Sequence, residues 1–262
     1  MKHNTPKTSS IEKAMDILTA FTREDLELST KELSERLPYN IATVHRTLHI
    51  LTKKEMLQQD KHTKKFKLGN LAFNLGRNAF RTTSGKLFDI AIPYIVNLSE
   101  QIGETVMLSA VSDRRILVIY IEQGRSGNSI QPSIGESISR HASAGGKAIL
   151  AFMPPYEWQT FLDHELEAFT PNTITNLEVL KRQLAQIRQD GIAFCEEERI
   201  LGLNAIAAPL INHNNRPVGA VTVLGLVGRL KCDNRSPMVA ELKKTAAEIN
   251  ARLFASGLKP YS

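Results

Sequence analysis

The chain has 262 residues, 42% of them hydrophobic, and is long enough for two domains that each bury a core. No segment approaches the roughly 18 consecutive apolar residues of a membrane span, and the polar start MKHNTPKTSS lacks the apolar region of a secretory signal. The two cysteines make no disulfide framework, so we expect a cytoplasmic protein without a membrane partner.

The net charge of +6 is unevenly distributed along the chain. Residues 38–81 contain 9 Lys and Arg against 2 Asp and Glu. Such an excess is expected on a segment that binds a polyanion, and it equally fits an ordinary solvated basic face.

The first predicted helix begins at Ser9, because Ser9 and Glu12 have the spacing of a capping box. Apolar residues then recur at helical spacing, which predicts that they share one buried face. These residues are Ile11, Ala14, Met15, Leu18 and Phe21.

The next two predicted helices are joined by a turn of about three residues. A second capping box, Ser29 with Glu32, begins one helix, which ends before Pro38 because proline disfavours helical geometry in the preceding residue. Asn40 can cap the other helix, and this spacing is typical of a helix-turn-helix. Its expected buried face consists of Ile41, Val44, Leu48 and Leu51. Its other side carries Ala42, Thr43, Arg46, His49 and Lys53.

A basic hairpin is predicted directly after these helices. Phe66 and Leu68 alternate with Lys65 and Lys67, which is the period of a strand, and a polar turn separates them from Leu57. Three helices followed by a hairpin predict a winged helix-turn-helix over residues 9–69. A weakly periodic segment then predicts a linker helix over residues 70–83.

The remaining residues, 84–257, predict a mixed domain in which an antiparallel sheet is flanked by helices, so the whole chain is α+β. The expected helices cover KLFDIAIPYIVNLSEQIG, SAGGKAILAF, NLEVLKRQLAQIRQDG and the segment from Val239 to Leu253. The expected strands are ETVMLSAV, RILVIYIE, NAIAAPLI and PVGAVTVLG.

The segment HASAGGKA resembles a phosphate-binding loop only in its adjacent Gly146 and Lys147. The remaining glycine and the hydroxyl residue of that motif are missing, so we reject a nucleotide site. Ser143 is nevertheless a good N-cap, and the first-turn amides of Ala144 and Gly145 would suit a carboxylate. A tight helix start packed against the sheet explains the same residues equally well.

Two other patterns argue against catalytic or metal chemistry. His45 and His49 have the spacing of paired metal ligands, but Arg46 stands between them and no third ligand is near, so we expect no metal. Cys195 precedes three glutamates, which would raise the pKa of its thiol and leave it unactivated. We therefore predict no catalytic residue and no cofactor.

Several motifs, in order, resemble the IclR family of bacterial transcriptional regulators. They are ELSERLPYNIATVHRTLHIL, FKLG, HASAGGKAILAF, IRQDGIAFCEEERILGLNAIAAPL and PVGAVTVLG, within a similarity from about Ser9 to Leu253. The resemblance implies a winged helix-turn-helix, a linker helix and a GAF-like effector domain, assembled as homodimers or homotetramers on palindromic operators. The chain departs from the family in having Pro38 where the turn usually has Gly, and Ala42-Thr43 where a Ser-Thr pair opens the recognition helix.

The resemblance also implies which residues bind DNA and effector. The residues expected to contact operator DNA are Thr30, Asn40, Ala42, Thr43, Arg46, Lys64 and Lys65. The residues that match the effector pocket are Ile130, Ile138, Ala144, Gly145, Cys195, Leu203, Ala205, Thr222 and Leu224. Because this pocket is more apolar than those that bind very small polar acids, we expect an organic acid with an apolar portion.

Together these features predict a DNA-binding regulator that responds to a small organic acid and is not an enzyme, and they favour a repressor over an activator. One alternative is a GAF-like thiol enzyme that uses Cys195 and Cys232, with the basic N-terminal domain as a tether. Another is a constitutive DNA-binding protein whose second half only oligomerises.

Overall fold

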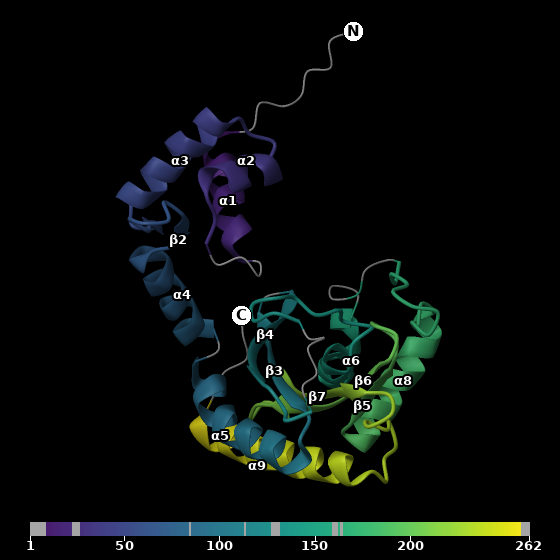
Figure 1. The fold of residues 1–262 in the computed structure, drawn as a ribbon. Helices are drawn as coiled ribbons and strands as arrows, with labels where there is room; N and C mark the ends of the chain where they lie inside the picture. Colours follow the sequence, from purple (N-terminus) through teal and green to yellow (C-terminus); the bar gives the residue numbers. More distant parts are fainter. Residues whose placement is uncertain are drawn as a thin grey trace. The chain divides into compact units, whose positions relative to one another are not determined.

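The computed structural model describes residues 9–22, 27–83, 85–112, 114–126, 132–158, 162 and 165–257. The chain forms two compact units that divide between Thr82 and Thr83 (Figure 1). Each unit has a hydrophobic core of its own.

The N-terminal unit contains three helices, a two-stranded hairpin and a further helix at its end. In chain order these are α1 (Ser10–Thr19), the 3-10 helix η1 (Ala20–Thr22), α2 (Thr30–Arg36), α3 (Ile41–Lys53), β1 (Leu57–Gln59), β2 (Phe66–Leu68) and α4 (Asn70–Thr83). Both predicted capping boxes are present, at Ser9 and at Ser29. In the second, the Ser29 amide donates to the Glu32 carboxylate over 2.7 Å, and the Glu32 amide donates to the Ser29 hydroxyl over 3.2 Å.

The hairpin closes the core of this unit. Strands β1 and β2 pair antiparallel, with Leu57 opposite Leu68. Leu28 also pairs with Phe66 through two backbone hydrogen bonds of 2.9 and 2.8 Å, which ties the segment before α2 to the hairpin. Three helices with this hairpin confirm the winged helix-turn-helix.

Two predicted buried faces are partly wrong. In α1, Ile11 and Met15 are 76% and 57% exposed, whereas Ile17, which the prediction left out, is fully buried beside Phe21. In α3, Ile41 is 56% exposed while the rest of its predicted face is buried. In α1 the apolar arc is wider than the surface its neighbours cover, and Ile41 lies at the very start of α3 beyond the core.

The C-terminal unit is a three-layer structure with a five-stranded antiparallel sheet in the middle (Figure 1). Its strand order is β4-β3-β7-β6-β5. Its helices are α5 (Gly85–Ile102), α6 (Ala144–Phe152), the 3-10 helix η2 (Pro155–Glu157), α8 (Leu177–Asp190) and α9 (Pro237–Ser256). Its strands are β3 (Thr105–Ser112), β4 (Arg115–Glu122), β5 (Ala193–Glu196), β6 (Leu203–Ile211) and β7 (Pro217–Leu226).

Two helices pack on each face of this sheet. Helices α5 and α9 contact each other and cover one face, and helices α6 and α8 cover the other (Figure 1). This arrangement confirms the predicted antiparallel sheet flanked by helices. The sequence did not predict edge strand β5, because four residues are too few for a clear alternation.

Candidate functional site

One face of helix α3 is polar and exposed. Asn40 caps this helix by accepting a hydrogen bond of 2.8 Å from the Thr43 amide. Val44 and Leu48 are completely buried, whereas Ala42 and Arg46 lie on the exposed side. Among the described residues no carboxylate forms an ion pair with Arg46, so the exposed face of α3 carries an unneutralised positive charge.

The hairpin presents lysines in two different settings. Asp60 orders the turn by accepting hydrogen bonds from the amides of His62 and Thr63, at 2.8 and 2.7 Å. Lys64 follows with a positive φ of 58° and is exposed. Lys65, by contrast, places its Nζ 3.2 Å from Oε1 of Glu32 on α2.

The Glu32 carboxylate therefore serves both a helix cap and the hairpin. Hydrogen bonds from the Ser29 amide and hydroxyl, and then the Lys65 ammonium, lower the pKa of Glu32 to about 2. Glu32 is consequently ionised at neutral pH, and the hairpin is tied to helix α2. Part of the charge on Lys65 is neutralised in this way.

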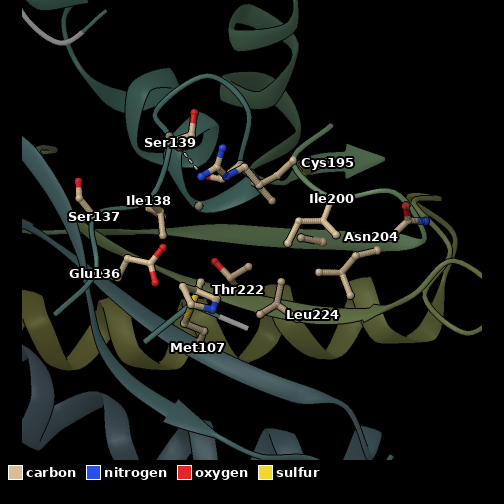
Figure 2. A pocket seen from close by; sticks show the side chains of 17 residues that line it. Met107, Glu136, Ser137, Ile138, Ser139, Cys195, Ile200, Asn204, Thr222 and Leu224 are labelled. Atoms are coloured by element: carbon tan, nitrogen blue, oxygen red, sulfur yellow. Dashed lines mark hydrogen bonds between the residues drawn. The ribbon is translucent and has the colours of Figure 1, made fainter. Parts of the chain in front are cut away.

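A cavity of about 200 Å³ lies between the sheet and the start of helix α6 (Figure 2). Its floor is the α6–α8 face of the sheet, with side chains from β3, β5, β6 and β7: Met107, Cys195, Leu203, Ala205, Thr222 and Leu224. The segment 136–139 forms another wall of the cavity. Two backbone hydrogen bonds of 2.9 Å join this segment to β4: the Val118 amide donates to the Glu136 carbonyl oxygen, and the Ile138 amide donates to the Ile116 carbonyl oxygen. The rest of the lining consists of Ser143, Ala144 and Gly145 at the start of α6, the loop residues Arg199 and Ile200, and Pro132 and Asn204.

Polar groups without partners meet at the start of α6. The Ser143 hydroxyl accepts from the Gly146 amide at 3.0 Å, and the amides of Ala144 and Gly145 have no acceptor among the described residues. Thr222 is 2% exposed, and within the described chain its Oγ1 has no hydrogen-bond partner. A Cβ atom at Gly145 would lie only 2.9 Å from this Oγ1, so the orphan hydroxyl and the orphan amides are neighbours.

Three contacts tie the loop after β5 to its surroundings beside the cavity. The completely buried Lys147 on α6 forms an ion pair with Glu198. The hydroxyl of Thr173 donates to the Glu198 carbonyl oxygen over 2.6 Å. The next residue, Arg199, stacks its guanidinium 3.7 Å from the ring centre of Phe169 and lines the cavity. These contacts hold a cation beside a mostly apolar cavity, whose lining also includes the carboxylate of Glu136 (Figure 2).

The two cysteines lie on opposite faces of the sheet. Cys195 belongs to the core between the sheet and α6–α8, and Cys232 packs against the core under α5 and α9. Burial raises the pKa of the Cys195 thiol to about 11, and the carboxylate of Glu198 adds to this effect. Burial and the carboxylate of Glu196 raise the pKa of Cys232 to about 12. Because both pKa values are raised, neither thiol is activated as a nucleophile.

Comparison with known protein families decides the class of protein. The helix-turn-helix lies within a match to the IclR helix-turn-helix domain at residues 10–61. A match to the bacterial transcriptional regulator IclR C-terminal domain at residues 80–251 covers most of the C-terminal unit and every residue that lines the cavity. The chain belongs to the IclR family of bacterial transcriptional regulators.

Similar proteins cover nearly the whole chain. The regulator BhcR of Paracoccus denitrificans is 31% identical over 92% of this chain and 86% of its own. The transcriptional repressor IclR of Escherichia coli is 27% identical over 94% and 90%, respectively. The IclR structure from Thermotoga maritima superposes with a TM-score of 0.79 at 28% identity, covering 93% of this chain and 98% of its own. An IclR homolog from Microbacterium hydrocarbonoxydans, complexed with 4-hydroxybenzoate, has the same fold, with a TM-score of 0.79 at 20% identity over 94% and 99%.

The fold brings together most of the cavity residues that the IclR resemblance implied. Eight of them line the same cavity, which Figure 2 shows: Ile138, Ala144, Gly145, Cys195, Leu203, Ala205, Thr222 and Leu224. The ninth, Ile130, lies outside the described residues. Across the described segments no helix is long and apolar enough to span a membrane, and no three His, Cys, Asp or Glu side chains are grouped as metal ligands.

Sequence reasoning missed several residues of this IclR-type site. Met107 lies directly opposite Thr222 in the β3–β7 register, so a pairing of these two strands would have predicted it. The signal for the ion pair was Lys147 itself, a charged residue within an almost wholly apolar helix. Nothing local indicated the position of Arg199. The other unpredicted lining residues are Pro132, Glu136, Ser137, Ser139, Ser143, Ile200 and Asn204.

Proposed function

We propose that this protein is a repressor that binds operator DNA through its N-terminal unit and a small organic acid through its C-terminal unit. The observation that carries the proposal is the cavity at the start of α6. Two orphan amides and the orphan hydroxyl of Thr222 there adjoin a mostly apolar floor. Helix-start amides, with the positive end of the helix dipole, stabilise a carboxylate.

The effector we infer is an acid with one carboxylate and an apolar body. The carboxylate accepts hydrogen bonds from the amides of Ala144 and Gly145 and from the Thr222 hydroxyl. The apolar body lies against Leu203 and Leu224 on the sheet, with the remaining cavity residues around it. An acid of this kind, 4-hydroxybenzoate, is bound by the Microbacterium homolog.

The exposed face of α3 supports a position in the major groove of DNA. Recognition helices present their N-terminal residues to base edges. We infer that Arg46 donates to a base edge or a phosphate, that the small Ala42 permits close approach, and that Thr43 lies near the backbone. The side-chain oxygen of Asn40, Oδ1, accepts the capping hydrogen bond, which leaves the side-chain NH2 group to donate to a phosphate.

Phosphate contacts would come from both sides of this helix. Thr30 is the first residue of α2 and offers a hydroxyl beside the positive end of that helix. The exposed Lys64 offers an ammonium group, and Lys65 contributes less because Glu32 already pairs with it. Operators of this family are expected to be palindromic, so we infer a homodimer or homotetramer. The similar proteins named as repressors, including IclR, favour repression over activation.

Operator binding is tested with duplex DNA selected from a random pool by the wild-type protein. We expect Arg46→Ala to weaken specific binding by about 1 to 3 kcal/mol, the usual value of a good base contact. Lys181→Ala, which changes an exposed lysine in the C-terminal unit, is the control and should leave operator affinity unchanged. Unchanged operator affinity of Arg46→Ala would refute the assignment of α3 as the recognition helix.

Effector binding is tested by thermal shift with aliphatic and aromatic monocarboxylic acids, each compared with its methyl ester. We expect some acids to raise the melting temperature and their esters to raise it less. Thr222→Val should reduce the stabilisation that these acids give. Thr245→Val, which changes a different buried threonine, on α9, should leave that stabilisation unchanged. Equal stabilisation by acid and ester would contradict the proposed carboxylate site.

A regulator also requires coupling between its two ligands. An effector that changes operator affinity by about 5- to 150-fold must have its own affinity changed by the operator through the same factor. Calorimetric titration of a stabilising acid, with and without the selected operator, measures this factor. Identical affinities would instead favour a constitutive DNA-binding protein.

A further inference from the structure

Ile41 is exposed at the start of helix α3, where the sequence predicted a buried residue. Its side chain is 56% exposed, and it is absent from the hydrophobic core of the N-terminal unit. It is the first residue of α3, directly after the cap Asn40 and beside the exposed Ala42. Burial in its own domain therefore does not explain an apolar residue at this position.

The chemistry of DNA limits what such a side chain can contact. A phosphate offers an isoleucine no hydrogen bond, and covering a charged oxygen with an apolar group is unfavourable. Of the groups that base pairs present in the major groove, the C5-methyl group of thymine is the apolar one. The N-terminal residues of a recognition helix are those that reach base edges.

We propose that Ile41 reads a thymine in each operator half-site by packing against its C5-methyl group. This inference rests on the proposed DNA-binding role of α3. The absence of a long side chain at Ala42 allows the start of the helix to approach the base pair closely. Ile41 is then a specificity-determining residue of this chain.

The experiment removes one methyl group at a time from the DNA. An operator is selected from random duplex DNA by the full-length wild-type protein, and each thymine is then replaced by deoxyuridine, which lacks only the C5-methyl group. Affinities are measured by fluorescence anisotropy at one fixed salt concentration. We expect one thymine position in each half-site at which the replacement weakens binding about fourfold, as follows from the burial of one methyl-sized group.

Two variants identify the side chain responsible. Ile41→Ala should bind the thymine and deoxyuridine operators equally. Ile50→Ala should keep the wild-type preference; Ile50 is 55% exposed but lies at the other end of the same helix. Both residues are exposed, so melting temperatures close to the wild-type value should verify that the variants fold.

Three results would overturn the inference, and they are distinguishable. If the wild type is insensitive to deoxyuridine at every position, no methyl group is read. If Ile41→Ala keeps the full preference for thymine, another side chain reads the methyl group. If the selection yields no preferred sequence at all, the proposed operator-binding function fails together with this inference.

Discussion

The buried ion pair between Lys147 and Glu198 should be essential for the stability of the C-terminal unit. The Lys147 side chain is completely buried and that of Glu198 is 7% exposed. The second carboxylate oxygen of Glu198, Oε2, has no partner among the described residues. Lys147→Met would thus leave a carboxylate in the interior with no positive charge beside it.

The expected magnitude is large because only one charge is removed. Leaving one member of a buried pair uncompensated costs about 3 to 5 kcal/mol of the free energy of unfolding. For a domain of about this size, 1 kcal/mol corresponds to roughly 2 to 4 °C in melting temperature, so we expect a loss of about 6 to 20 °C. Replacing both residues, as Lys147→Met with Glu198→Leu, should be less destabilising than Lys147→Met alone.

Urea unfolding followed by tryptophan fluorescence measures the free energy of unfolding of the C-terminal unit, because the tryptophan lies in that unit. Trp158 is the single tryptophan of the chain, and its indole donates to the Leu150 carbonyl oxygen on α6 over 3.0 Å. The matched control is Lys181→Met, because Lys181 pairs with Glu178 on the surface, where their side chains are 43% and 74% exposed. We expect that control to change the free energy of unfolding by less than about 0.5 kcal/mol.

Two results would refute this reasoning. If Lys147→Met lowered the free energy of unfolding no more than Lys181→Met does, the charge of Lys147 would not be needed to compensate that of Glu198. If the double variant lost as much free energy of unfolding as Lys147→Met and Glu198→Leu lose in total when made separately, the two side chains would not be coupled.

Three further predictions concern DNA, thiol chemistry and the effector cavity. Lys64→Ala should reduce the slope of the logarithm of operator affinity against the logarithm of salt concentration by about one unit. Lys65→Ala should reduce this slope by clearly less, because Glu32 already neutralises part of the charge of Lys65. Equal changes of slope in the two variants would contradict this difference between the lysines. In the folded protein, the pKa of about 11 gives Cys195 a thiolate fraction at pH 8 roughly a hundredfold below that of an ordinary thiol, so iodoacetamide labelling followed by mass spectrometry should be slow and should accelerate as the pH rises. Rapid labelling at pH 8 would reject this. Gly145→Val should weaken the binding of a stabilising acid at least about tenfold in calorimetry, because the new Cβ would lie 2.9 Å from the Thr222 hydroxyl. The control Gly228→Val has open space around it and should leave the affinity for the acid unchanged. Equal losses of affinity in the two variants would argue against the cavity as the binding site.

Local sequence signals predicted the elements of this protein well. Both capping boxes, the Asn40 cap and the alternation around Phe66 depend on residues within a few positions of one another. Such signals act through hydrogen bonds and periodicities that are already present in the isolated segment. The order of motifs, from helix-turn-helix to HASAGGKA, was also sufficient to indicate the family.

The same local signals could not decide which apolar residues are buried. Ile11 and Ile17 both lie on α1 and are equally apolar, yet the first is 76% exposed and the second is completely buried. The difference depends on which side of the helix the rest of the unit covers. The exposed Ile41 has the same origin, since burial is a property of the packed domain and not of the helix.

Only the tertiary structure decided how the charged residues pair and where the cavity lies. Lys65 meets Glu32 across 33 positions of sequence, and Lys147 meets Glu198 across 51. Neither contact leaves a periodic trace, because each depends on the packing of elements that are remote in the chain. The cavity likewise exists only where β3, β5, β6 and β7 meet the start of α6. The sequence alone therefore could not show that the buried hydroxyl of Thr222 lacks a hydrogen-bond partner among the described residues.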